Sequence, residues 1–412
     1  MDEDMPKLGS TVPPSAGAGE PGEPPPPSGC EISVLMPCLN EADTIAVCVQ
    51  KAKKALAGEG IDGEVLVADN GSTDGSQAIA ERLGARVVHV KEKGYGAALM
   101  GGIAAARGCY VIMGDADDSY NFEEIPKFIR ELRKGFDLVQ GCRLPAGGGT
   151  VLPGAMLFTH RWWGNPMFTF LARRMFGAPI HDIYCGMRGF SRRAYFRLDQ
   201  RCTGMEFATE MIIKAAGSGL KVGEVPITLH PDGRKAHSPH LKTFRDGWRT
   251  LRFFLVCSPR WLFLYPGLLL FLLGVVGYGL AMPGRSIGRA TLDAHTLLVA
   301  SLALLVGQQA ILFGVFAKMF SINEGLSPPD PRINRMFAIL TLERGLIAGA
   351  IAIALGVILL VWAATIWRSH DFGHLNYSHT MRLVVPGVTL TALGVQGILG
   401  GFMISIMGMH RK

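Results

Sequence analysis

Four long uncharged segments in the C-terminal part of this 412-residue chain restrict its fold more than any other feature. None of them contains Asp, Glu, Lys or Arg, and each supplies the ~20 apolar residues that an α-helix needs to cross a hydrocarbon core. A soluble domain would have to bury four helices that are apolar on every side, which is unusual. The sequence therefore predicts transmembrane helices over residues 262–282, 294–317, 345–367 and 383–409.

The composition indicates a different kind of domain before these segments. The whole chain has a mean hydropathy of +0.26 and 18% charged residues, against about 25% in average soluble proteins. The deficit lies mainly after residue 260, because residues 30–260 have the composition of an ordinary α/β protein. The eight cysteines form no C-x-x-C pair, which favours free thiols in a reducing compartment over a metal cage or a disulfide framework.

Residues 1–29 are predicted to be disordered, because they are rich in Pro and Gly and lack the apolar core of a signal peptide. We therefore expect the next domain to stay on the side of the membrane where it is made. Over residues 30–240, short β-branched and apolar runs alternate with helical segments, which predicts an α/β domain with a mostly parallel sheet and covering helices. Strands are expected at 32–36, 64–68, 86–90, 110–113, 137–140 and 221–227, and helices at 43–57, 74–83, 96–107, 123–134 and 206–217.

Two further segments are candidates for contact with the membrane surface. Residues 241–260 contain an apolar stripe beside a basic stripe, which is the pattern of a helix in the membrane interface; a helix packed on the domain with a solvated basic face is the alternative. Residues 162–176 are either a second membrane contact or ordinary core. The stripes consist of Leu241, Phe244, Trp248, Leu251 and Leu255 and of Lys242, Arg245, Arg249 and Arg252.

Positive charges flanking the spans indicate how the chain is oriented, because cytoplasmic loops carry an excess of Lys and Arg. With the N-terminal domain inside, the inner flanks carry eleven such residues and the outer loops four. We therefore predict a multi-pass integral membrane protein, with a membrane domain over 261–412 and a cytoplasmic N-terminal domain, in the plasma membrane of a bacterium or the ER membrane of a eukaryote. The inner residues are Lys242, Arg245, Arg249, Arg252, Arg260, Lys318, Arg332, Arg335, Arg344, Arg411 and Lys412, and the outer ones are Arg285, Arg289, Arg368 and Arg382.

Polar and glycine-rich clusters follow each of the first four predicted strands, at 37–41, 69–75, 91–96 and 114–118. Open parallel sheets bind ligands at the carboxyl ends of their strands, so these clusters predict one site. Asp115 and Asp117 would repel each other without a cation, and oxygen ligands without nearby His or Cys favour Mg²⁺ or Mn²⁺. Such an ion would bridge the phosphates of a nucleotide diphosphate and stabilise it as a leaving group.

Together these motifs resemble those of the family 2 glycosyltransferases, and in particular the dolichyl- and polyprenyl-phosphate mannose or glucose synthases. The resemblance implies a GT-A-like fold and an inverting transfer of sugar from a UDP- or GDP-linked donor to a polyprenyl phosphate. It extends over roughly 31–240, through PCLNE (37–41), DNGSTDG (69–75), KGYGAALMGG (93–102), DADD (115–118), GCR (141–143), Asp182, CGMRGF (185–190), MEFATE (205–210) and EVP (224–226).

The resemblance implies roles for individual residues. The donor would be bound by Pro37, Leu39, Glu41, Asp69, Lys93, Asp115, Ala116, Asp117 and Arg143, with Asp115 and Asp117 as the metal ligands. The catalytic residues would be Asp182, Arg143, Arg188 and Arg234; Asp182 could orient the acceptor, act as a base or be purely structural. Guanidinium groups match phosphate oxygens, so candidates for the acceptor phosphate are Arg143, Arg161, Arg234 and Lys235.

The chain departs from the family pattern in three places. Asn70 replaces the usual second Asp of a DDGS motif, and Ser119 stands where a metal-binding Gln is common. Residues 234–240 replace an R-x-x-G-x-S-K segment, which leaves the residues around the acceptor phosphate open.

Other readings remain open at this stage. The acceptor could be another glycolipid or a growing polysaccharide, although the Q-x-x-R-W motif of processive synthases is absent. A transporter fused to a nucleotide sensor is disfavoured, because Gln308 and Gln309 are the only polar residues near the middle of the second span. A dehydrogenase is disfavoured because Gly94-Tyr-Gly96 is only a fragment of G-x-G-x-x-G. No nucleic-acid partner is expected, and Gly397 and Gly401 leave a homo-oligomer open.

Overall fold

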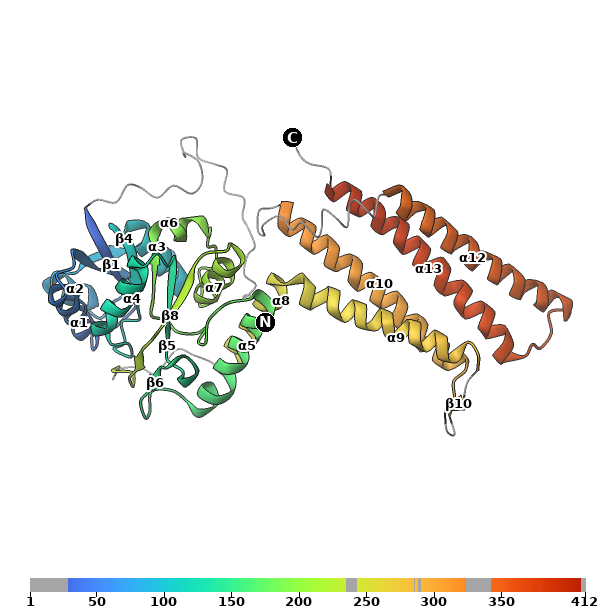
Figure 1. Ribbon diagram of the computed structural model, residues 1–412, viewed down its shortest axis with the longest axis horizontal. Coiled ribbons are helices and arrows are strands. Elements are labelled where there is room, and N and C mark those ends of the chain that lie inside the picture. Colours follow the sequence, from blue (N-terminus) through green and yellow to red (C-terminus); the bar gives the residue numbers. More distant parts are fainter. Residues whose placement is uncertain (1–28, 235–242, 285, 288–289, 324–341, 409–412) are drawn as a thin grey trace. The chain divides into compact units, whose positions relative to one another are not determined.

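The computed structural model describes residues 29–234, 243–284, 286–287, 290–323 and 342–408. It divides into two compact units, Met1–Leu251 and Arg252–Lys412 (Figure 1). The predictions made for residues 1–28, for Lys235 and for the rest of 235–242 lie outside the described residues.

A seven-stranded sheet forms the centre of the first unit, with the strand order β3-β2-β1-β4-β7-β5-β8. All neighbours pair in parallel except β7, which runs antiparallel to both β4 and β5. This confirms the predicted mostly parallel sheet. The strands are β1 (Cys30–Cys38), β2 (Gly63–Asp69), β3 (Arg86–His89), β4 (Gly108–Met113), β5 (Leu138–Cys142), β7 (Arg188–Ser191) and β8 (Val222–Pro226).

Helices cover both faces of this sheet (Figure 1). Alternate residues of β1, Ile32, Val34 and Met36, join a buried cluster with side chains of α1 (Ile45–Gly58) and α4 (Ile125–Arg133). The intervening residue Leu35 faces α3 (Tyr95–Ala105), where Gly102 lies against it. Because successive side chains of a strand point to opposite faces, these residues show that β1 is buried on both sides, which agrees with its mostly apolar sequence from Ile32 to Met36. The other helices of the unit are α2 (Ser76–Arg82), α5 (Asn165–Phe176), α6 (Arg192–Arg197) and α7 (Phe207–Gly217), and a small sheet pairs β6 (Thr150–Val151) with β9 (Thr228–Leu229).

Strand β7 is the element of the main sheet that the sequence did not predict. Its four residues, Arg-Gly-Phe-Ser, have no β-branched side chain and no alternation of apolar residues. Pairing with β4 and β5 on its two sides makes it a strand, and this pairing comes from the tertiary structure. The strand matters for the site because it carries Arg188 and follows the loop that contains Gly186.

The second unit contains the four predicted spans as long helices. Helices α9 (Tyr265–Ala281), α10 (Ala294–Asn323), α12 (Leu342–Ser369) and α13 (Tyr377–Gly408) belong to four candidate membrane spans, over Arg260–Ala281, Ala294–Ile322, Leu342–Ser369 and Tyr377–Gly408. Helix α9 packs on α10, α12 packs on α13, and α10 also contacts α13. The protein is an integral membrane protein.

Small residues bring the backbones of these helices close together. A Cβ on Gly274 of α9 would lie 2.7 Å from a Leu304 side-chain carbon, and one on Gly356 of α12 would lie 2.6 Å from the Gly387 carbonyl oxygen. Close approach through small residues is the usual basis of helix packing in membranes, where apolar surface alone gives little driving force.

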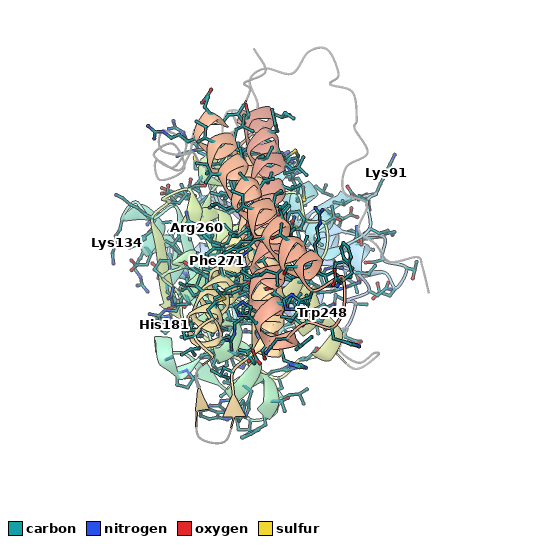
Figure 2. The ribbon with its side chains drawn as sticks, turned by 90° about the vertical axis from the view of Figure 1, so that its right-hand side faces the viewer. Lys91, Lys134, His181, Trp248, Arg260 and Phe271 are labelled. Carbon is teal, nitrogen blue, oxygen red and sulfur yellow. The ribbon has the colours of Figure 1, made fainter. Side chains whose placement is uncertain are left out.

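The predicted interfacial segment contains helix α8 (Thr243–Cys257). Trp248 of this helix, labelled in Figure 2, is 62% exposed, whereas Phe254 is buried, so only part of the helix surface is exposed. The position of α8 in a membrane interface stays a prediction. The eight cysteines all lie within the described residues and form no disulfide there, which agrees with the thiols predicted from the sequence.

Candidate active site

Asp115 and Asp117 follow β4 directly, and Ala116 between them is buried. The Tyr95 hydroxyl donates to Oδ1 of Asp115 at 2.8 Å, and the Ser119 amide and hydroxyl donate to Oδ1 of Asp117 at 3.0 and 2.6 Å. Oδ2 of Asp117 lies 3.4 Å from Nη1 of Arg234. Each carboxylate therefore has one oxygen fixed by a neutral neighbour and one oxygen with weaker or no partners among the described residues.

The loop before β7 closes tightly over this pair. A Cβ added to Gly186 would lie 2.7 Å from Oδ2 of Asp115, and the Gly186 amide donates to the Tyr120 hydroxyl oxygen at 2.8 Å. Any other residue at 186 would push against the carboxylate. This approach explains why a glycine follows Cys185 at this point of the chain.

The surroundings of the pair suit a divalent cation. Burial, together with the charge of Asp117, raises the pKa of Asp115 to about 6. No group of three or more His, Cys, Asp or Glu side chains forms a metal cage in the part of the chain that the structure describes. Mg²⁺ is commonly held by one or two carboxylates together with substrate phosphates, so two Asp side chains fit an ion that is completed by a diphosphate.

Glu41 lies at the end of β1 in a buried ion pair with Arg234. The Arg234 side chain donates to the Glu41 carboxylate through Nε at 2.9 and 3.0 Å and through Nη2 at 2.6 Å, and its Nη1 donates to Asp232 at 3.0 Å. Burial alone would lower the pKa of Arg234, but Glu41 and Asp117 outweigh it and raise this pKa. The structure thus places Arg234 among carboxylates on the predicted donor side. Of the other donor residues near β1, Pro37 is half-buried and Leu39 is exposed.

Asp69 and Asn70 hold the loops after β2 and β3 in place. The buried Asp69 carboxylate accepts from the amides of Gly71 and Ser72 and from Gln77. Burial alone would raise the pKa of Asp69, but these hydrogen bonds outweigh it and lower the pKa. The Asn70 amide donates to the carbonyls of Val90 and Glu92 and accepts from the Gly94 amide.

Lys93 lies on the loop after β3 and contacts the loop after β2. The Lys93 ammonium donates to the Asn70 carbonyl at 2.6 Å. An Asp at position 70 could not make the two donor contacts of Asn70, which is a physical reason for that departure from the family pattern.

Arg143 and Asp182 form a two-point ion pair in the interior of the domain. Nε of Arg143 donates to Oδ2 of Asp182 at 2.7 Å, Nη2 donates to Oδ1 at 2.9 Å, and the Arg143 amide also donates to Oδ2. The remaining Nη1 lies 3.4 Å from the Tyr120 hydroxyl. Burial would lower the pKa of Arg143, but Asp182 raises it well above its usual value.

Asp182 and Arg188, both predicted among the catalytic residues, have no exposed surface. Arg188 donates to the carbonyls of Cys185 and Ala208, and burial lowers its pKa. With both oxygens of Asp182 bonded to Arg143, the geometry favours positioning roles for Asp182 and Arg188 over direct contact with a substrate.

A cavity of about 530 Å³ is lined by residues that neighbour Arg143 and Asp182 in the sequence. It is lined by Leu144, Pro145 and Ala146, which follow Arg143, and by His181, which precedes Asp182. Arg161 contributes a guanidinium whose Nε is buried without a hydrogen-bond partner among the described residues. The other lining residues are Trp162, Pro166, Thr169, Phe170, Arg173 and Arg174, so the cavity combines cationic and apolar walls.

Large apolar side chains lie exposed around this cavity. Six residues of the predicted segment 162–176 and its neighbourhood are at least half exposed: Leu157, Phe158, Trp162, Trp163, Met167 and Phe170. Phe168 is buried, so ordinary core describes only part of that segment. Exposed apolar patches of this kind mark contact with a membrane or a partner.

Several residues of the site were not predicted from the sequence. Tyr95, Tyr120 and Asp232 contact Asp115, Arg143 and Arg234, and Glu224 accepts from the amides of His181 and Asp182. Tyr95 and Glu224 stand inside motifs, KGYG and EVP, but a single tyrosine or glutamate in a motif gives no sign of which atom it will meet.

The fold and the site together define a class: a GT-A-like α/β domain with a paired-carboxylate site at the strand ends, joined to a helical membrane unit. The description "Glycosyl transferase family 2" matches residues 33–198, and "Glycosyltransferase family 2 C-terminal transmembrane region" matches residues 315–408. The chain belongs to glycosyltransferase family 2 and is a glycosyltransferase.

Two relatives from Haloferax volcanii illustrate the similarity. The low-salt glycan biosynthesis hexosyltransferase Agl6 is 39% identical over 92% of this chain and 89% of its own length. The dolichyl-phosphate hexose transferase is 32% identical over 53% of this chain and 89% of its own length.

Proposed function

We propose that the protein transfers a hexose from a UDP- or GDP-linked sugar to a polyprenyl phosphate at the cytoplasmic face of the membrane. The observation that carries this proposal is the cavity beside Arg143 and Asp182, with Arg161, Arg173 and Arg174 next to Trp162 and Phe170. A polyprenyl phosphate combines a dianionic head with an apolar chain. The arginines of the cavity match the head, and its apolar side chains match the chain. The dolichyl-phosphate hexose transferase named above supports this class of acceptor.

On the donor side, Asp115 and Asp117 would hold Mg²⁺ or Mn²⁺, which would neutralise charge on the leaving diphosphate. Glu41, Asp69 and Lys93 surround the same strand ends and would line the nucleotide. Tyr95 and Ser119 keep the two carboxylates in fixed orientations, so the site is organised before the donor arrives.

On the acceptor side, a phosphate oxygen would attack the anomeric carbon while the bond to the nucleotide diphosphate breaks, with inversion at that carbon. A phosphate monoester is largely dianionic at neutral pH, so it needs no strong base. This agrees with an Asp182 that is buried and bonded to Arg143. The chain's contribution would be alignment and charge neutralisation through Arg143, Arg161 and, if it is released from Glu41, Arg234.

The membrane parts would keep the domain near its lipid substrate. Helix α8 and the exposed side chains around the cavity would contact the headgroup region, and four spans would anchor the chain. The distribution of Lys and Arg supports a cytoplasmic domain. A cysteine placed at Ile287, between α9 and α10 in the sequence, should be labelled only from outside, and labelling only from the cytoplasm would contradict this orientation.

A direct assay tests the reaction. Purified full-length protein is incubated with Mg²⁺ or Mn²⁺, undecaprenyl or dolichyl phosphate, and a panel of radiolabelled UDP- and GDP-sugars. A lipid-extractable labelled product that requires the lipid's phosphate is expected for at least one donor. Transfer only to a glycolipid or a polysaccharide, or no transfer from any donor, would overturn the proposal.

A further inference from the structure

His181, which lines the cavity, is hydrogen-bonded to Glu224. The proposed reaction gives this pair no role. Nδ1 of His181 lies 2.7 Å from Oε2 of Glu224. Oε1 of the same carboxylate accepts from the backbone amides of His181, at 2.8 Å, and Asp182, at 3.2 Å. The Glu224 side chain is 12% exposed, while that of His181 is 38% exposed.

This arrangement fixes both the ring and the backbone that carries it. One carboxylate oxygen holds the main chain of residues 181 and 182, and the other determines which ring nitrogen is engaged. Among the described residues, the bond to Glu224 is the hydrogen bond of the His181 ring. Since Nδ1 is taken by Glu224 and His181 is one of the residues that line the cavity, Nε2 is the ring nitrogen left for a ligand.

The neighbouring charges show what kind of ligand would bind to Nε2. Arg161, Arg173 and Arg174 line the same cavity, and the buried Nε of Arg161 has no partner among the described residues. Three guanidinium groups in one cavity repel one another unless an anion lies among them. A phosphate monoester supplies that anion and can accept hydrogen bonds from several donors at once.

We propose that His181 is a ligand of the acceptor phosphate, donating from Nε2, and that Glu224 is the positioning residue that orients it. This inference rests on the proposed function, because it takes the cavity to be the acceptor site. With Nδ1 donating to Glu224, the other ring nitrogen, Nε2, would donate to the phosphate from an imidazolium whose charge the phosphate balances.

The test measures binding of undecaprenyl phosphate, undecaprenol and inorganic phosphate to the full chain in detergent. The main variant is His181→Asn, whose amide can still donate to Glu224 but offers nothing at the position of Nε2. We expect a dissociation constant for undecaprenyl phosphate about tenfold higher than that of the wild type, from the loss of one charge-assisted hydrogen bond.

Two further variants make the result specific. In His181→Gln, the amide nitrogen reaches the position of Nε2, so this variant should retain more affinity than His181→Asn. It also carries the test if His181→Asn lowers the melting temperature. The matched control is His370→Asn, at an exposed histidine after α12, which should bind like the wild type.

The outcomes separate the two proposals. If the wild type binds undecaprenyl phosphate more tightly than undecaprenol, and both His181 variants match the wild type, the role of His181 is refuted while the proposed acceptor stands. If the wild type does not distinguish undecaprenyl phosphate from undecaprenol, the proposed acceptor itself is refuted. Equal affinity for inorganic phosphate would show that the cavity binds a free anion and not a lipid.

Discussion

The guanidinium of Arg234 spans two carboxylates from distant parts of the chain: it donates to Glu41 at 2.6 Å and lies 3.4 Å from Asp117. Arg234→Gln should therefore leave Glu41, Asp117 and Asp232 as an uncompensated acidic group. We expect a loss of about 3 kcal/mol of unfolding free energy in metal-free protein, since removing one partner of a buried ion pair is costly. The melting temperature with and without Mn²⁺ checks this, because added Mn²⁺ should recover part of the loss. An equal loss in both conditions would contradict it.

Replacing either member of the acidic pair should abolish transfer. Asp115→Asn or Asp117→Asn removes a charge from the proposed metal site while keeping its shape, so binding of Mn²⁺, measured by electron paramagnetic resonance, should weaken by at least about tenfold. Asp118→Asn is the matched control, because its carboxylate pairs with Lys51 at 2.7 Å and its positive φ of 60° suits Asn as well as Asp. Unchanged Mn²⁺ binding in both site variants would refute the metal assignment.

The affinity for the metal should depend on pH through Asp115. Burial and the charge of Asp117 raise the pKa of Asp115 to about 6, so a cation must displace a proton below that pH. The apparent affinity for Mn²⁺ should rise with pH up to roughly 6 and then level off. The same raised pKa means that this group costs the metal-free fold stability as pH rises from its unfolded value of about 4 to about 6. Mn²⁺ should therefore raise the melting temperature more at neutral than at acid pH.

Tyr95 offers a way to shift that pH profile. Its hydroxyl donates to Asp115, and this hydrogen bond lowers the pKa of the carboxyl against the effect of burial. Tyr95→Phe should move the midpoint of Mn²⁺ binding to higher pH. A profile that stays in place would show that Asp115 does not control it.

Asn70→Asp would bring the chain closer to the family pattern, but we expect it to lower both stability and affinity for the donor. The Asp cannot donate to the carbonyls of Val90 and Glu92, and it places a charge beside them. We expect a loss of about 2 kcal/mol of unfolding free energy and a higher KM for the donor, because Lys93 sits on the loop that Asn70 holds. Thermal melting and donor kinetics measure the two effects. A variant with wild-type stability would contradict this role of Asn70.

Two glycines of α12 test the packing of the membrane unit. A Cβ at Gly356 would lie 2.3 Å from Thr391 Oγ1 and 2.6 Å from the Gly387 carbonyl oxygen, whereas one at Gly345 meets nothing within 4 Å. Gly356→Val should therefore separate α12 from α13 and lower the melting temperature in detergent, while Gly345→Val should leave it nearly unchanged. Equal effects of the two substitutions would contradict this packing.

Local patterns in the sequence were enough to predict much of the fold. The apolar and β-branched residues of β1 and the spacing of apolar residues in α4 are patterns between neighbours a few positions apart, and both elements appear where they were expected. Strand β7 could not be found in this way, because its sequence has no strand pattern and its pairing partners lie far along the chain. The polar clusters at the strand ends were visible in sequence for the same reason as the strands, since each cluster directly follows one.

The sequence by itself determined that the chain has an α/β domain with an acidic site and four spans, because hydrophobic periodicity and uninterrupted apolar length are local properties. Only the tertiary structure decided which charges meet. It joins Arg143 to Asp182, Arg234 to Glu41 and His181 to Glu224, across 39, 193 and 43 residues of chain. The strength of each ion pair depends on distance and on exclusion of water, and both are properties of the packed domain. For this reason Asp182, which could have been a base in the sequence, is a buried partner of Arg143 in the structure.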